Sequence, residues 1–219
     1  MCIRDRPSLV SNLKAEGYSG NKAMHPFNPY NYNRPAVYKD FGFTDFIDKF
    51  DFPKNVKRVR EYISDEANVD RIISEYEKNR KKTDQPFYMY NMTIQNHSPY
   101  DKDAANFKQP IKIESSKYDA EANRYLNLIK YSDDSLKQLT GYFEKCKEPT
   151  IILFLGDHQP RLTDEFMNKI TNGQYQTWSS EQMMKRYQVP FVIWANYDIK
   201  EQHIEKTSMN YIQSIPVSY

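Results

Sequence analysis

The dipeptide Asp157-His158 follows Gly156 at the end of an apolar run over residues 150–155. When such a run is a strand of a parallel sheet, polar residues at its carboxyl end lie at the edge where ligands bind. The aspartate offers a hard oxygen and the histidine a borderline nitrogen, a combination that suits divalent ions such as Mn²⁺ or Zn²⁺. A hydrogen-bonded Asp-His pair at a turn is the alternative, and the dipeptide does not decide between them.

A second polar cluster, Gln95-Asn96-His97-Ser98-Pro99-Tyr100, follows the apolar run 87–94. The asparagine and histidine of such a cluster can bind a phosphoryl oxygen or a leaving-group oxygen. The alternative for His97 is a surface loop position without a chemical role.

A third cluster contains His25 and Arg34, in a loop rich in proline and asparagine. The planar arginine side chain is suited to bidentate phosphate contacts, although each residue taken singly could also be an ordinary loop residue. His203 lies in the polar run 200–205, which predicts a solvated face.

The elements that must position these clusters alternate between helix and strand. The pattern predicts strands over 18–24, 87–94, 150–155 and 189–195, and helices over 8–16, 35–40, 65–81, 121–145 and 207–215. A long polar loop is expected from Gln95 to Ser116. Such alternation favours one α/β domain with a mostly parallel central sheet and helices on both faces.

Composition excludes several classes of protein. The 31 basic and 29 acidic residues give a net charge of +2, without the basic field that nucleic-acid binding needs. No run approaches the roughly 20 apolar residues of a membrane helix, and residues 1–6 lack the apolar core of a secretory signal. Two cysteines, Cys2 and Cys146, imply no disulfide framework.

The two ends of the chain have unusual sequences. One permitted back-translation of residues 1–6 contains a transposase adapter used in sequencing libraries, and one of residues 216–219 contains the start of the adapter's reverse complement. We therefore expect residues 1–6 and 217–219 to derive from an adapter, which leaves 7–216 as part of a domain. Genuine but unusual termini are the alternative.

Taken together and in this order, the clusters resemble a known family. His25, Asn33-Arg34, the segment 96–100 and Gly156-Asp157-His158 are similar to motifs in the extracellular catalytic domain of lipoteichoic acid synthases, within the sulfatase and alkaline-phosphatase superfamily. Residues 38–46 and 185–196 also resemble that family, and the similarity runs over nearly all of 7–215. The resemblance implies a sulfatase-like α/β catalytic domain, here truncated at its N-terminus.

The resemblance also implies a reaction. Members of the family use a threonine nucleophile bound to Mn²⁺ to take glycerol phosphate from phosphatidylglycerol, and pass it to a growing polyglycerolphosphate chain. The metal in this protein is expected to be Mn²⁺, with Mg²⁺ or Zn²⁺ as alternatives. The expected partners are the phosphatidylglycerol headgroup and the glycerolphosphate polymer. The expected location is the outer face of a bacterial cell membrane, reached through N-terminal helices absent from this sequence.

Roles carry over only at matching positions. Asp157 and His158 match two metal ligands, and His97 matches a histidine that acts at the substrate phosphate and glycerol oxygens. Arg34 matches a phosphate-binding arginine and His25 a nearby active-site histidine. One further position, Tyr32, stands where many members have tryptophan, so the resemblance implies a stacking role there that this sequence would fill with a different ring.

The family's threonine nucleophile and an early metal-binding glutamate lie upstream of the segment that matches 8–17. This sequence therefore contains neither, and we expect the chain by itself to be inactive. Alternatives are another hydrolase of the sulfatase superfamily, a phosphoethanolamine transferase, or a domain that binds headgroups without catalysis.

Overall fold

The structure is a computed structural model that describes residues 8–171, 173, 175–212 and 214–217. The expected adapter residues 1–6, 218 and 219 lie outside the described residues. The chain divides into two compact units. Unit 1 comprises the described residues up to His97 together with Asp103–Lys108 and Tyr131–Ser135, and unit 2 comprises Ser98–Lys102, Gln109–Lys130 and the described residues from Leu136 onward.

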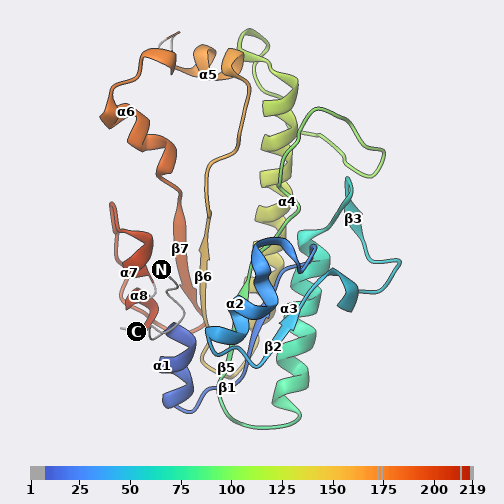
Figure 1. The fold of residues 1–219 in the computed structure, drawn as a ribbon, viewed down its shortest axis with the longest axis vertical. Coiled ribbons are helices and arrows are strands. Elements are labelled where there is room, and N and C mark those ends of the chain that lie inside the picture. Colours follow the sequence, from blue (N-terminus) through green and yellow to red (C-terminus); the bar gives the residue numbers. More distant parts are fainter. Residues whose placement is uncertain (1–7, 172, 174, 213, 218–219) are drawn as a thin grey trace. The chain divides into compact units, whose positions relative to one another are not determined.

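Unit 1 contains the helices α1 (Leu9–Ala15), α2 (Arg34–Asp40) and α3 (Asp65–Arg80) and the strands β1 (Ser19–Met24), β2 (Asp45–Ile47), β3 (Arg58–Val59), β4 (Tyr62–Ile63) and β5 (Phe87–Asn91) (Figure 1). Strands β3 and β4 form a small antiparallel hairpin. The predicted helices over 8–16, 35–40 and 65–81 are confirmed to within a residue or two, and the strand predicted over 87–94 ends earlier, at Asn91.

The main sheet of unit 1 has three parallel strands in the order β2-β1-β5. Side chains alternate between its faces, because the side-chain period of a strand is two. Helix α3 covers the face that carries Met24 and Ile47, and α2 covers the face that carries Phe46 and Tyr90. The predicted fold class, α/β with a parallel sheet between helices, is therefore confirmed.

The α3 face of this sheet is a largely aliphatic core. Met24, Ile47, Phe52 and Ile63 are buried there, with partly buried hydrophobic residues such as Ile72 packed against them. The α2 face is aromatic instead: the ring of Tyr38 lies 4.9 Å from Phe46, 5.6 Å from Phe43 and 6.0 Å from Tyr90 between centroids. Burial of both faces places the central strand β1 between two apolar layers.

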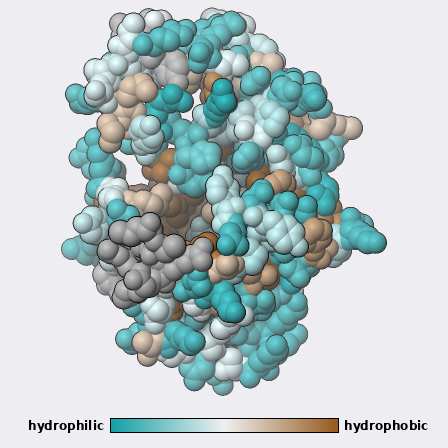
Figure 2. All heavy atoms as spheres, viewed as in Figure 1, coloured by the Kyte–Doolittle hydropathy of each residue, from teal (hydrophilic) through white to brown (hydrophobic). Residues whose placement is uncertain are grey.

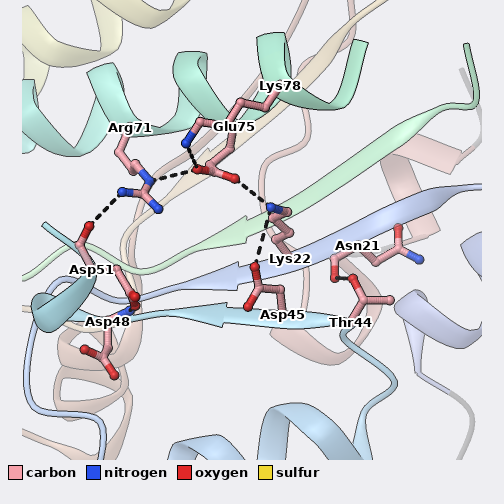
Figure 3. A network of polar contacts seen from close by, with 9 residues as sticks. All are labelled: Asn21, Lys22, Thr44, Asp45, Asp48, Asp51, Arg71, Glu75 and Lys78. Atoms are coloured by element: carbon pink, nitrogen blue, oxygen red, sulfur yellow. Dashed lines mark hydrogen bonds and ion pairs between the residues drawn. The ribbon is translucent and has the colours of Figure 1, made fainter. Parts of the chain in front are cut away.

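One ion-pair cluster crosses the α3 face. The carboxylate of Glu75 lies 2.6 Å from Lys22 Nζ, 3.0 Å from Arg71 Nε and 2.8 Å from Lys78 Nζ, and Lys22 also lies 3.5 Å from Asp45 (Figure 3). Burial alone would raise the pKa of Glu75, but the hydrogen bonds and charges of these cations outweigh it and hold the pKa at about 2. The cluster connects α3 to β1 and, through Asp45, to β2.

Unit 2 contains most of the long helix α4 (Ala120–Phe143), the helices α5 (Asp164–Ile170), α6 (Ser180–Met184), α7 (Met209–Ile212) and α8 (Ser214–Val217), and the strands β6 (Ile151–Leu155) and β7 (Phe191–Ala195). The strands predicted over 150–155 and 189–195 exist, but within the described residues they pair antiparallel with each other as a two-stranded sheet. The helix predicted over 207–215 corresponds to the described helices α7 and α8. Val217, the last residue of α8, is the one described residue of the expected adapter remnant 217–219.

The predicted polar loop from Gln95 to Ser116 is largely irregular, and α4 fixes part of it. Asn127 is fully buried and exchanges two hydrogen bonds with Ile111, accepting from its N–H at 2.9 Å and donating to its carbonyl at 3.0 Å. One turn earlier, Asn123 accepts from the N–H of Ile113 at 3.1 Å. The two side-chain amides bond the backbone of this segment as a neighbouring strand would. The backbone around Ile111 and Ile113 therefore has hydrogen-bond partners although it forms no regular structure.

Figure 2 shows a face of the molecule on which hydrophilic side chains predominate, in keeping with the mean hydropathy of −0.87. A search of the described residues finds no helix that is long and apolar enough to cross a membrane.

Replacing Glu75 by Gln is expected to lower the free energy of unfolding at pH 7 by on the order of 3 kcal/mol, because a buried group loses its charge among three cations. The pKa of Glu75 is lower in the folded chain than its usual value of 4.5. Its contribution is therefore complete above about pH 4.5 and is lost as the pH falls toward 2. Urea unfolding followed by circular dichroism at several pH values measures both effects.

Glu66→Gln is the matched control, since Glu66 lies on the same helix in an exposed pair with Lys57. It should change stability by less than about 1 kcal/mol. Equal losses in the two variants would contradict the special role of Glu75.

Candidate functional site

His25 follows the carboxyl end of the central strand β1 and is 2% exposed. Its backbone N–H donates to Ile47 O at 2.9 Å, which continues the β1–β2 ladder by one residue. Its ring Nδ1 lies 3.0 Å from Met92 O, and since a carbonyl only accepts, Nδ1 carries a proton. In the neutral ring, Nε2 is then the nitrogen with the lone pair.

Arg34 begins α2 and is oriented by three groups. Its guanidinium donates to Asn31 O at 3.1 Å, contacts Met92 Sδ at 3.8 Å and hydrogen-bonds the phenol of Tyr38 one turn along the helix. Burial raises the pKa of Tyr38, and the charge of Arg34 partly offsets this. Among the residues that the structure describes, no carboxylate forms an ion pair with Arg34, so its charge is available to an anion.

Tyr32 is 86% exposed, and Arg34 stacks on its ring at 5.0 Å. Tyr32 and Asn33 have φ angles of 58° and 52°, a left-handed conformation that is unfavourable for a tyrosine. Such backbone strain is concentrated at binding sites in proteins. The exposed ring is thus held in place by the turn that also starts α2.

His97 follows the carboxyl end of β5 by six residues and is exposed. A row of rings runs from His25 to Phe27 at 6.1 Å, on to Tyr62 at 5.9 Å and from there to His97 at 6.3 Å. His25 and Arg34 meet at Met92, and His97 stands at the far end of this row. Unit 1 therefore gathers His25, Tyr32, Arg34 and His97 around the carboxyl ends of β1 and β5.

Asp157 and His158 lie in unit 2, directly after β6. Gly156 allows their turn to form close to β7, because a Cβ there would lie 3.2 Å from Val189 Cβ. The side chains of Asp157 and His158 are 69% and 71% exposed, and Oδ2 lies 3.6 Å from Nε2. Gln159 anchors the turn by donating to Lys185 O at 2.7 Å and Gln188 O at 2.9 Å.

The chemistry of this pair fits part of a metal-ligand set. Two ligands bound at about 2.1 Å to one tetrahedral ion lie roughly 3.4 Å apart, close to the 3.6 Å between Asp157 and His158. His158 Nδ1 lies 2.9 Å from Gln159 O, which holds the proton on Nδ1 and leaves Nε2 for a metal. Across the described parts of the chain, no group of three or more His, Cys, Asp and Glu side chains is arranged to hold an ion.

Two buried groups that contact the segment Gln95–His97 are not predictable from the sequence. Arg60 is 8% exposed and donates to the carbonyls of Gln95 and His97. Asp65, the first residue of α3, is 4% exposed, and burial raises its pKa to about 6 although a hydrogen bond from Ser132 opposes the rise. Their contacts join residues that are 30 to 67 positions apart in the sequence, so no local pattern reveals them.

Comparison with known proteins identifies the family. A family model described as Sulfatase matches residues 3–215. The chain belongs to the sulfatase family. A Rhizobium meliloti protein named for cyclic β-1,2-glucan modification is 33% identical over 198 residues, which are 87% of this chain and 30% of that protein. The lipoteichoic acid synthase-like protein YvgJ of Bacillus subtilis is 28% identical over 157 residues, 69% of this chain and 24% of YvgJ.

Two solved structures share the fold. The lipoteichoic acid synthase LtaP of Listeria monocytogenes superposes with a TM-score of 0.66 at 24% identity, over 87% of this chain and 47% of LtaP. The phosphoglycerol transferase GacH of Streptococcus pyogenes, solved with sn-glycerol-1-phosphate, gives a TM-score of 0.60 at 22% identity, over 82% of this chain and 44% of GacH. The chain thus spans less than half the length of these relatives. Enzymes of this superfamily generally depend on a metal.

Asp65→Asn is expected to flatten the pH dependence of stability between about pH 4 and 6. The pKa of Asp65 is about 6 in the folded chain against a usual value of 3.8, so the folded state holds the proton more tightly. Stability therefore falls as the pH rises through this window, by on the order of 3 kcal/mol at most. Urea unfolding midpoints at pH 4, 5, 6 and 7 measure the slope.

Asp84→Asn is the control, because the Asp84 side chain is 98% exposed. It should leave the slope unchanged. An Asp65→Asn variant with the wild-type slope would show that Asp65 titrates as it does in the unfolded chain.

Proposed function

We propose that the chain is part of a metal-dependent phosphoglycerol transferase that moves glycerol phosphate from phosphatidylglycerol to an acceptor chain. The observation that carries this is Arg34, a fixed cation without a carboxylate partner among the described residues, placed with His25 at the carboxyl end of β1. Membership of the sulfatase family and the likeness to GacH with its glycerol phosphate support the same substrate class.

In this proposal, Arg34 binds the non-bridging oxygens of the phosphodiester and stabilises the charge that grows on them as the transferring group is attacked. His25 lies beside it with Nε2 as an acceptor, and the exposed Tyr32 offers a ring to the glycerol or headgroup portion. These three side chains come from one short stretch of chain, from the end of β1 to the first residue of α2, so we propose that they act on the same anion.

His97 is the proposed acid–base residue. As the bond between phosphorus and the diacylglycerol oxygen breaks and a bond to the nucleophile forms, its imidazolium gives a proton to the departing oxygen. In the second half of the reaction, the neutral ring takes a proton from the entering acceptor hydroxyl, which restores the starting state. The two halves balance, because one group is carried through a covalent intermediate.

Asp157 and His158 are the proposed ligands of a divalent metal, Mn²⁺ with Mg²⁺ or Zn²⁺ as alternatives. When bound, such an ion lowers the pKa of a hydroxyl nucleophile and neutralises phosphoryl charge. The threonine nucleophile and the remaining glutamate ligand are proposed to belong to a preceding part of a longer protein at the outer face of a bacterial membrane. The 219-residue chain by itself is then expected to be inactive.

The comparisons also favour a different acceptor for the transferred glycerol phosphate, namely a glucan. Identity with the Rhizobium meliloti protein named for glucan modification, 33% over 87% of the chain, exceeds the 28% over 69% found with YvgJ. A glucan hydroxyl could accept the same group that a polyglycerolphosphate hydroxyl accepts. The donor chemistry and the residues assigned above are the same in both cases.

The test uses the full-length protein in which this chain occurs. His158→Ala is expected to lose bound Mn²⁺ and activity together, whereas Arg34→Ala should keep the metal and lower kcat/KM by roughly 10²- to 10³-fold. Metal content and diacylglycerol release from a fluorescent phosphatidylglycerol measure the two properties. Lys39→Ala, an exposed cation on the same helix as Arg34, should behave as wild type.

Unchanged metal content in His158→Ala would remove His158 from the metal site. Offering the enzyme a glycerolphosphate primer and a β-1,2-glucan in parallel separates the two acceptors. Release of headgroup to water with both acceptors present would favour a hydrolase instead.

A further inference from the structure

The backbone of the segment Gln95–His97 is held by a buried arginine, Arg60. One guanidinium nitrogen of Arg60 donates to Gln95 O at 2.7 Å and to His97 O at 2.8 Å. The backbone N–H of His97 donates in turn to Ile94 O at 2.9 Å. Both backbone polar groups of His97 are therefore fixed, although its side chain is exposed.

The side chains of the same segment close a ring of hydrogen bonds. Gln95 Nε2 donates to Asp65 Oδ2 at 3.3 Å and to Asn96 Oδ1 at 3.3 Å. Asn96 Nδ2 donates to Ser132 Oγ at 2.8 Å, and Ser132 Oγ donates to Asp65 Oδ2 at 2.5 Å. A further bond from the Asp65 N–H to Gln95 Oε1 at 3.0 Å ties the ring to the start of α3.

Arg60 has a backbone conformation that is normally found with other residue types in hairpin turns. It opens the two-residue turn between β3 and β4 with a φ of 54°, where glycine, asparagine or aspartate is preferred. A glycine would be less strained here but would have no guanidinium. Strain of this kind persists where surrounding contacts require it, and the contacts of Arg60 are the carbonyls on either side of Asn96.

The ring of His97 is aligned by the same residue. The Arg60 guanidinium lies 5.3 Å from the centroid of the Tyr62 ring, and the rings of Tyr62 and His97 are 6.3 Å apart between centroids in an edge-to-face arrangement. Burial is the main cause of the raised pKa of Tyr62, so its phenol stays neutral at ordinary pH. Arg60 thus reaches His97 both through the backbone and through this aromatic contact.

We propose that Arg60 and Asp65 are positioning residues for His97, and this inference rests on the role given to His97 in the proposed function. They hold the segment Gln95–His97 in one conformation, so that an exposed imidazole meets the glycerol oxygen without first being ordered. The effect falls on the chemical step, because small displacements of a proton-transfer group lower the rate steeply. Neither residue needs to touch the substrate.

Arg60→Gly in the full-length protein is the main test, since it removes the guanidinium while relieving the turn. We expect kcat for phosphatidylglycerol turnover to fall by roughly 10- to 100-fold, with KM changed by less than about threefold. The double variant Arg60→Gly/His97→Ala should be no slower than His97→Ala, because Arg60 acts through His97. Amide hydrogen exchange over residues 95–98 should become faster, while exchange over helix α3 should be unchanged.

The matched control is Arg58→Ala, which removes another arginine of the same hairpin, one whose side chain donates to Glu61 O at 2.9 Å. It should retain wild-type kcat. Asp65→Asn, which keeps the size of the side chain, should lower kcat less than Arg60→Gly does.

The outcomes separate the two claims. If His97→Ala loses activity while Arg60→Gly retains wild-type kcat, or if the double variant loses activity additively, the positioning role is overturned and the proposed function stands. If the wild-type protein does not turn over phosphatidylglycerol, the proposed function fails. Unchanged exchange over residues 95–98 in Arg60→Gly would then overturn the positioning role independently.

Discussion

The ion pairs of Glu75 connect helix α3 to the central strand of unit 1. Burial would raise the pKa of this carboxylate, but three cations hold the pKa low, and one of them, Lys22, belongs to the central strand. Lys22 precedes His25 by three residues, so the pair that links α3 to the sheet lies close to the carboxyl end of β1. The apolar core stabilises the packing of α3 on the sheet, and these charges add a specific contact between α3 and β1.

From that strand end, the proposed binding residues follow in a short stretch of chain. His25 takes the last ladder position, and a turn with two left-handed residues leads into Arg34, whose guanidinium meets His25 at Met92. The ring of Tyr32 lies against Arg34. His97 follows the end of β5, and β5 is the neighbour of β1 in the sheet, on the side opposite β2. The arrangement follows the general rule that parallel sheets bind ligands at the carboxyl ends of their strands.

Most helices and strands and the general location of these residues are predictable from the sequence, because apolar periodicity and polar strand ends are local signals. Contacts between residues that are distant in the sequence are not predictable in this way. The run Ile151–Leu155 is apolar enough for a central parallel strand, yet its partner among the described residues is the antiparallel β7. Asn123 and Asn127 read as ordinary polar helix positions, although they hold the segment 109–113. Arg60 and Asp65 likewise look like surface charges until Gln95 is placed between them.

The turn conformation of Arg60 has a consequence for anyone who engineers this domain. Libraries screened for expression or heat resistance reward residues that relax the backbone. Glycine or asparagine at this position would be selected in such a screen. The loss of the guanidinium would not be noticed, because the turn belongs to a short hairpin outside the main sheet. A position that a stability screen would choose to improve is thus one that a screen for turnover would choose to keep.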